Sequence, residues 1–402
     1  MPKKRDFIVH SLQSWIAFFG TTVSKYITLE LCKTNRVIFL DTPLPRNYQL
    51  FKRDAAETKK YSKIFSGQEP ELEQINENLW IMHPSTVLES INWISNPGIH
   101  DWFGKMNDRR YAKKAQEAID KLHFKDFIIL NDNSMISGIN FKELLKPAVS
   151  IYFLRDHVTK VAYHATHGAR QEPEMIKRSD IVVTNSPYFT DYAKKFNPNS
   201  YFIGQGVDID LYNDDKGTLS VPDELKNIPH PRIGYTGNIV TLRLDLDLLV
   251  YIAEQRPDWS LVLVGPEDEA FKNSKLHQMK NVYFLGGRPG TELPGFVKGF
   301  DVAINPQIIN EITNINYPLK LDEYLAMGVP VAATKTWFMD YYFSKDSYLA
   351  ATKEEYITQI TKALAEDSPE KHKERILLGK SHSWGNFVDK LYTYIDLFLD
   401  KR

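Results

Sequence analysis

The sequence predicts an α/β protein built from two parallel-sheet domains in tandem. Short apolar runs alternate with amphipathic segments along the whole chain, which is the pattern of strand–helix–strand units. This alternation breaks at residues 213–231, where charged residues, glycine and proline replace it. A chain of 402 residues with 43% hydrophobic content can also bury the cores of about two domains.

The first domain is predicted over residues 1–212. Its strands are expected at residues 6–10, 36–40, 79–82, 126–130, 149–153, 181–184 and 201–203. Helices are expected at residues 25–33, 109–122, 172–178 and 188–196. Two long polar connections interrupt the pattern, at residues 41–78 and 85–108. Long loops inside a compact domain are usually functional or mobile, and we expect the same here.

The second domain is predicted over residues 232–383, after a linker at residues 213–231. Its strands are expected at residues 233–236, 260–264, 282–285, 302–305 and 329–333, with a helix at residues 246–255. The apolar-periodic segment at residues 384–402 follows the second sheet, so we expect a closing helix that packs back on the first domain. Two such sheets suggest Rossmann-like domains facing a central cleft, with ligands at the carboxyl ends of the strands.

Charge and cysteine content exclude several classes of function. Fifty Lys and Arg residues stand against 51 Asp and Glu, so no basic field favours nucleic acid. The single cysteine, Cys32, rules out an intramolecular disulfide and a cysteine-based metal cluster, and it fits a reducing cytoplasm. The start of the sequence lacks the apolar stretch of a signal peptide, and no apolar run has the ~18 residues of a membrane span.

The segment at residues 314–334, NINYPLKLDEYLAMGVPVAAT, predicts a loop, a short helix and a buried strand. Pro318 suits a first helical turn, and Gly328 suits the helix end. Lys320 and Glu323 lie three residues apart and therefore on one face. A helix N-terminus beside a cation attracts phosphate, and a carboxylate one turn later can bind both hydroxyls of a ribose. A surface helix with an ordinary ion pair is the alternative.

Other loops after predicted strands add to this pattern. Gly237 permits close backbone approach, and Arg243 can clamp a diphosphate. The turn GGRPG can bring backbone polar groups against a planar base. Each loop alone could be an ordinary turn, but together they predict a nucleotide pocket. Its expected contacts are the base at Gly286 and Arg288, the ribose on Glu323, and the phosphates on Gly237, Asn238, Arg243, Lys320 and the backbone of Asn316, Tyr317, Pro318 and Leu319.

The chain resembles the GT-B glycosyltransferases, specifically the retaining family 4 group. The motifs behind the resemblance are, in order, GYTGN, WSLVLVGP, NVYFLGGR, LPGFVKGFDVAINP, PLKLDEYLAMGVPVAAT and a final HSW helix. In the first half, SDIVVTNSPYFTDYAKKFNPNSYFIGQGVDIDLY matches the segment that closes the N-terminal domain of that group. Within it, the nearest kin are bacterial enzymes of capsule, exopolysaccharide or teichuronic acid assembly.

The resemblance implies transfer of a sugar from a nucleotide-diphosphate sugar to an acceptor hydroxyl, with retention of configuration. It implies no metal and no permanently bound cofactor, so Arg243 and Lys320 would stabilise the leaving diphosphate. The implied partners are the donor, a saccharide or lipid-linked acceptor and, peripherally, the inner membrane face.

The chain departs from the family pattern at two positions. The family commonly carries two glutamates eight residues apart, and Glu323 matches the second, while Ile315 stands at the first. Polar contacts to the donor sugar could come from Thr313, Asn314 or Asn316 instead. Asn238 also replaces a basic residue of the family.

The first domain offers acceptor-side candidates. Asp156 and His157 follow the strand at residues 149–153, where they could orient or deprotonate an acceptor, although capping of the next helix is the alternative. A metal site at His164 and His167 is not expected, because carboxylate and cysteine partners at matching spacings are missing. Gly20 resembles the close-contact residue of the loop that approaches the donor phosphate in GT-B enzymes.

Two further functional classes remain open. An epimerase of the same fold would handle the nucleotide sugar without an acceptor. A catalytically silent subunit would bind the nucleotide sugar without turning it over. A dinucleotide-dependent dehydrogenase is disfavoured, since no G-x-G-x-x-G follows the first strand.

Overall fold

The computed structural model describes residues 4–16, 22–46, 56–157, 159 and 162–401, and Gly20 therefore lies outside the described residues. The chain divides into two compact units. Unit 1 comprises Met1–Gly204 and Val388–Arg402, and unit 2 comprises Gln205–Phe387. The predicted linker at residues 213–231 lies within unit 2, where it contains the short helix α8 (Asp223–Lys226).

Unit 1 is built on an eight-stranded sheet of order β3-β4-β2-β1-β5-β6-β7-β8. All neighbouring strands are parallel except the edge pair β3–β4. The strands are β1 (Asp6–Ser11), β2 (Arg36–Leu40), β3 (Leu72–Asn76), β4 (Leu79–Met82), β5 (Ile128–Asp132), β6 (Val149–Leu154), β7 (Ile181–Thr184) and β8 (Ser200–Phe202).

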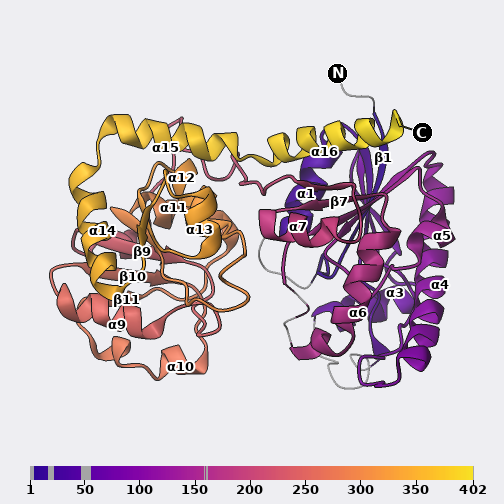
Figure 1. Ribbon diagram of the computed structural model, residues 1–402, viewed down its shortest axis with the longest axis horizontal. Coiled ribbons are helices and arrows are strands. Elements are labelled where there is room, and N and C mark those ends of the chain that lie inside the picture. Colours follow the sequence, from indigo (N-terminus) through magenta and orange to yellow (C-terminus); the bar gives the residue numbers. More distant parts are fainter. Residues whose placement is uncertain (1–3, 17–21, 47–55, 158, 160–161, 402) are drawn as a thin grey trace. The chain divides into compact units, whose positions relative to one another are not determined.

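Helices cover both faces of this sheet. They are α1 (Val23–Cys32), α3 (Ala56–Phe65), α4 (Pro97–Leu122), α5 (Phe141–Leu145), α6 (Ala162–Arg178) and α7 (Pro187–Lys194). Figure 1 shows α4 and α5 on one side of the sheet and α1 on the other. On the α4 side, Tyr111 and Phe141 pack against Ile8 and Ile129 of the sheet, so this core is continuous from helix to strand.

The closing helix α16 (Trp384–Leu399) packs on unit 1 from Val388 onward, as the sequence predicts. The ring of Tyr394 stacks on Tyr201 with centroids 4.2 Å apart. Tyr392 accepts a hydrogen bond from the Asn35 amide. The apolar periodicity of this segment therefore reports a face that is buried against the first sheet.

Unit 2 is built on a six-stranded, fully parallel sheet of order β11-β10-β9-β12-β13-β14. The strands are β9 (Arg232–Thr236), β10 (Ser260–Val264), β11 (Val282–Phe284), β12 (Val302–Asn305), β13 (Val331–Thr334) and β14 (Tyr348–Ala350). The longer helices are α9 (Leu246–Gln255), α14 (Lys353–Glu366) and α15 (Pro369–Ser381), and the shorter ones are α10 (Glu269–Lys272), α11 (Leu293–Lys298), α12 (Lys320–Ala326) and α13 (Trp337–Tyr342).

Two predicted helix starts are wrong. The helix expected from residue 109 begins at Pro97, because Asn96 caps it through a hydrogen bond from the Ile99 N–H and proline is tolerated in the first turn. The helix expected from residue 172 begins at Ala162 and continues through Pro173.

The edge strands β3 and β14 were not predicted. The sequence of β3, LEQIN, is polar and its residues are half-buried or exposed, so it lacks the apolar run that marks the inner strands. In the part of the chain that the structure describes, no helix is long and apolar enough to cross a membrane.

Candidate functional site

The loops that follow β9 and β12 are hydrogen-bonded to each other at the carboxyl edge of the unit 2 sheet. Leu244 pairs with Gln307 in an isolated bridge, and the Ile308 N–H donates to the Arg243 carbonyl at 3.0 Å. The Arg243 side chain is exposed, and within the described ranges no hydrogen bond or ion pair engages it. The backbone of Arg243 is thus held in place at the strand ends, while its guanidinium group is available to bind an anion.

The turn at Gly237 lies against the turn after β10. The N–H of Gly237 donates to the Val264 carbonyl at 2.9 Å. A Cβ atom at Gly265 would collide with the carbonyl oxygen of Gly237. Both glycines have positive φ, 159° at Gly265 and 129° at Gly237. Only glycine fits this contact, so the two turns pack tightly against each other at the strand ends. We call the backbone surface formed by Gly237 and Gly265 the glycine floor.

Lys320 projects toward this floor. Its Nζ lies 5.0 Å from the centre of the Tyr235 ring, and a Cβ atom at Gly237 would lie 3.6 Å from it. The side chain is half-buried, and no described carboxylate forms an ion pair with it. The half-buried ammonium group therefore retains capacity to bind an anion beside Gly237.

Glu323 lies about one helical turn from Lys320 on the same face of α12, and it is half-buried. Burial raises the pKa of Glu323 to about 7, while the charge of Lys320 and a hydrogen bond from the Tyr212 hydroxyl oppose the rise. Ligand hydroxyl groups that donate to this carboxylate would favour its ionised form.

Two neighbours of Glu323 hold α12 in place. The Tyr324 hydroxyl accepts a hydrogen bond at 2.9 Å from the backbone N–H of Thr236, the last residue of β9. Asp322 is fully buried and accepts hydrogen bonds from Tyr317 Oη at 2.7 Å and from His382 Nδ1 at 2.8 Å. Glu323 is thus presented on a helix that is anchored on both sides.

The residue at the position of the missing family glutamate, Ile315, is a core side chain with 7% exposure. Among its polar neighbours, Asn314 Oδ1 accepts from the Trp337 N–H at 2.8 Å, and the Thr313 hydroxyl donates to the Ile308 carbonyl. The buried Oδ1 of Asn316 has no hydrogen-bond partner among the described residues. Of the three proposed substitutes, Asn316 is therefore the one with an uncommitted acceptor.

The GGRPG turn follows β11 at the edge of the sheet. Gly286 has φ 70° and open space where a Cβ atom would be, which leaves its backbone accessible. The Arg288 guanidinium is engaged elsewhere, because it donates to Glu224 at 2.8 Å and lies 5.6 Å from the centre of the Phe296 ring. Asn238 is exposed, and its carbonyl accepts from the Tyr235 hydroxyl at 3.1 Å.

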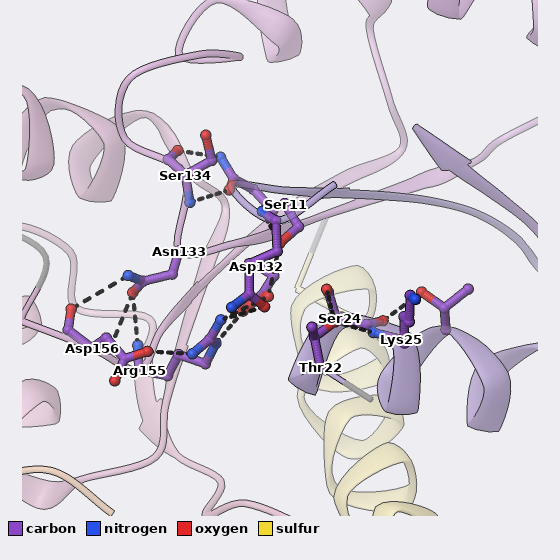
Figure 2. Close-up of polar contacts among 12 residues, drawn as sticks. Ser11, Thr22, Ser24, Lys25, Asp132, Asn133, Ser134, Arg155 and Asp156 are labelled. Carbon is purple, nitrogen blue, oxygen red and sulfur yellow. Dashed lines mark hydrogen bonds and ion pairs between the residues drawn. The ribbon is translucent and has the colours of Figure 1, made fainter. Parts of the chain in front are cut away.

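In unit 1 Asp156 follows β6 at the carboxyl edge of the sheet, where its partly exposed carboxylate pairs with the buried guanidinium of Arg155. Figure 2 shows Arg155 between Asp132 and Asp156, with Asn133 beside them. Arg155 Nε donates to Asp132 at 2.6 Å, and a second guanidinium nitrogen pairs with Asp156. The Asp156 carboxylate is thus already engaged. His157 follows it, with its ring 6.1 Å from that of Phe189.

Sequence reasoning missed the environment of Glu172. This side chain is 3% exposed on α6, and its Oε2 has no hydrogen-bond partner among the described residues. Burial raises the pKa of Glu172 to about 7, although a hydrogen bond with Tyr192 opposes the rise. The sequence showed no signal for this burial, because it depends on the longer course of α6.

Over the described ranges, no group of three or more His, Cys, Asp or Glu side chains could hold a metal ion. A cavity of about 600 Å³ lies elsewhere in unit 2, lined by residues of α13, β14, α14 and α15. Its charged side chains largely pair with each other, for example Lys371 with Glu366 at 2.8 Å. None of the predicted nucleotide contacts lines this cavity, so it is not the candidate site.

Comparison with known proteins matches residues 230–366 to the family described as Glycosyl transferases group 1. The chain is also 26% identical over 237 residues to TuaH of Bacillus subtilis (strain 168), which has a proposed assignment as a teichuronic acid biosynthesis glycosyltransferase. That match spans 56% of this chain and 58% of the length of TuaH.

Solved structures share the fold over the whole chain. A trehalose-phosphate synthase (UDP-forming) from Burkholderia vietnamiensis matches with a TM-score of 0.68, 10% identity and coverage of 100% of both chains. HepE of Anabaena in complex with UDP matches with a TM-score of 0.64 and 13% identity, over 98% of this chain and 99% of HepE. At such identities the likeness shows the fold alone, and it confirms the predicted pair of Rossmann-like domains.

Proposed function

From a group 1 glycosyl transferase domain at residues 230–366 and the GT-B fold of the whole chain, we propose that the protein transfers a sugar from a nucleotide-diphosphate sugar to an acceptor hydroxyl. The proposal includes retention of anomeric configuration, independence of a divalent metal and a role in cell-surface polysaccharide synthesis. The assignment of TuaH to teichuronic acid biosynthesis supports that role.

The observation that carries the proposal is the arrangement of Lys320, Glu323 and Gly237 at one edge of the unit 2 sheet. Lys320 points at the glycine floor, where a diphosphate can approach the backbone closely. Glu323 lies one turn further along α12 and binds the ribose hydroxyls in this proposal. The base then lies against the backbone at Gly286, and UDP in the HepE complex makes uracil the first base to test.

Charge stabilisation of the leaving group is the chemical role of the cations. As the glycosidic bond breaks, negative charge grows on the diphosphate. Lys320 and Arg243 attract this growing charge, so they stabilise the transition state more than the ground state. The backbone N–H groups of Tyr317 and Leu319 add donors, and the free acceptor of Asn316 faces a hydroxyl of the donor sugar in this proposal. The departing phosphate then takes the acceptor proton, so no protein nucleophile is required.

The acceptor in this proposal is a saccharide or a lipid-linked saccharide, with peripheral contact at a membrane. Asp156 and His157 are the acceptor-side candidates in unit 1. Because the departing phosphate takes the acceptor proton and Arg155 already pairs with Asp156, we assign Asp156 and His157 to orientation of the acceptor.

Thermal-shift titration tests the nucleotide site. Wild-type protein and a Glu323→Ala variant are titrated with UDP, GDP and CMP, each with and without EDTA, and Glu254→Ala on the exposed face of α9 serves as the control. A ligand at 100 times its dissociation constant stabilises the folded state by about 2.7 kcal/mol. We expect one nucleoside diphosphate to stabilise wild type and the control regardless of EDTA, and Glu323→Ala to lose this effect. No stabilisation by any nucleotide would refute the proposal.

A catalytically silent nucleotide-binding subunit is the second candidate, and the burial of Ile315 favours it, because a contact to the donor sugar common in the family is missing. Such a subunit would show the same thermal shift but leave nucleotide sugars intact. An epimerase would convert the nucleotide sugar without any acceptor. Product analysis after incubation with and without acceptor separates the three.

A further inference from the structure

The first turns of helix α4 in unit 1 expose large apolar side chains that the proposed transfer reaction does not use. Trp102 is 64% exposed and Ile99 is 52% exposed, and Trp93, three residues before the helix cap, is 80% exposed. The buried side of the helix is turned toward the sheet and consists of His100, Asn107, Asp108, Tyr111, Ala112, Ala115, Ala118 and Ile119. The exposed indole rings are thus an outward feature of unit 1 that packing of the core does not explain.

A row of cations continues the exposed face. Lys105, Arg109 and Lys113 recur every four residues and are all exposed, so they lie along one side of α4. Their neighbours on the flank of the helix are paired with acids, Arg110 with Glu89 and Lys114 with Glu71 and Glu117. In the described structure the three cations of the row form no ion pair.

The acid nearest to Trp102 is already neutralised. Asp101 accepts two hydrogen bonds from the guanidinium of Arg170 on α6, both at 2.7 Å. This bidentate pair contributes no net charge beside the exposed indole ring.

The remaining acids of the same face lie far from the tryptophans. At about 1.5 Å of rise per residue, Glu117 and Asp120 are ~22 and ~27 Å along the helix from Trp102, whereas the first two cations are only ~4 and ~10 Å away. Charges at the surface are screened over about 10 Å at moderate ionic strength. An anionic surface in contact with the tryptophans therefore meets the cations of α4 and not its acids.

We propose that the N-terminal end of α4, with Trp93, Ile99 and Trp102, docks on the surface of an anionic phospholipid bilayer. Indole rings favour the boundary between lipid headgroups and acyl chains, because they combine a large apolar body with a polar N–H. The Trp93 N–H already donates to the Ser90 carbonyl at 2.6 Å, so its ring can enter that boundary without an unpaired donor. Lys105 and Arg109 then lie above anionic headgroups.

This docking surface gives a specific location to the membrane contact in the proposed function, but it does not depend on the transfer reaction. It lies wholly within unit 1, while the candidate nucleotide site lies in unit 2. Lipid binding and nucleotide binding can therefore be measured separately, and the failure of one leaves the other standing.

Vesicle flotation tests the inference. Full-length protein is mixed with vesicles of phosphatidylcholine alone, or of phosphatidylcholine with about a third phosphatidylglycerol, at low and at high salt. The apolar variant is Trp93→Ser with Trp102→Ser, and its control is Trp337→Ser, a partly exposed tryptophan of unit 2. The charge variant is Lys105→Gln with Arg109→Gln, and its control is Lys194→Gln with Lys195→Gln, an exposed pair at the C-terminal end of α7. UDP thermal shifts and unfolding temperatures are recorded for every variant.

We expect wild type and both controls to float with the anionic vesicles at low salt and to be released at high salt. Removal of each cation should weaken partitioning about fivefold, so the charge variant should lose roughly 25-fold. The tryptophan variant should stay with the soluble fraction while it remains folded. The inference would be overturned if wild type did not float, or if the tryptophan variant floated as well as wild type. If wild type bound neutral and anionic vesicles equally, the electrostatic part of the inference would be overturned. Capture of an acidic protein without vesicle binding would assign the face to a protein partner instead.

Discussion

The ionisation of Glu323 should control how nucleotide affinity depends on pH. A carboxyl group with a pKa of about 7 is roughly one-tenth ionised at pH 6 and nine-tenths ionised at pH 8. If the ionised form is the one that accepts the ribose hydroxyls, affinity rises about tenfold over this range, which is about 1.4 kcal/mol. The sign follows from the raised pKa, since binding below pH 7 requires the carboxyl group to lose its proton.

Isothermal titration calorimetry at pH 6, 7 and 8 measures this effect, with wild type compared to Glu323→Gln. The terminal phosphate of a nucleoside diphosphate also titrates near pH 6, so the ratio of the two affinities is the informative quantity. We expect this ratio to grow about tenfold between pH 6 and pH 8, and wild type to release more protons on binding than Glu323→Gln. A ratio that stays constant would refute the assignment of Glu323 to the ribose.

The remaining predictions concern stability and backbone fit. Gly265→Ala should lower the free energy of unfolding by about 1–3 kcal/mol and abolish nucleotide binding, because its Cβ atom would displace the Gly237 turn. Denaturant unfolding measures the first effect and nucleotide titration the second, and normal binding would contradict the close contact. Asp322→Ala should lower the free energy of unfolding by on the order of 3 kcal/mol, because the buried Tyr317 hydroxyl and His382 lose their hydrogen-bond acceptor. An unchanged denaturation midpoint would contradict a stabilising role of these two hydrogen bonds. Burial holds the folded-state pKa of Glu172 near 7, above the usual value of a glutamate, so wild type should lose about 2.5 kcal/mol of stability as pH rises from 5 to 8. Glu172→Gln should not show this loss, and parallel pH profiles of the two proteins would contradict the prediction.

Much of the fold could be predicted from the sequence. The strands at residues 36–40, 79–82, 181–184, 260–264 and 302–305 have the predicted bounds, because inner strands of a parallel sheet are buried on both faces and read as continuous apolar runs. The helices at residues 246–255 and 384–399 also match. The polar edge strand β3 and the start of α4 at Pro97 could not be predicted in this way, since neighbouring elements and not local composition determine them.

The candidate site was predictable in part. Strand ends and glycine turns identified Gly237, Lys320 and Glu323, and the structure brings these residues together. The engagement of Arg288 by Glu224 and the hydrogen bond of Tyr212 to Glu323 depend on residues distant in sequence. Such tertiary partners leave no trace in spacing or periodicity. The roles of all these residues in ligand binding stay predictions.

Donor turnover with and without an acceptor tests the central claim most directly. Purified protein is incubated with UDP-glucose and related nucleotide sugars in EDTA, either alone or with aryl glycosides and lipid-linked saccharides as acceptors, and release of nucleoside diphosphate and the glycosylated product are quantified by mass spectrometry. The account predicts that one donor is consumed, that an acceptor accelerates its consumption and is glycosylated, and that Lys320→Ala lowers kcat at least tenfold. Tight nucleotide binding without any consumption of donor, or consumption to an epimer without acceptor, would contradict it.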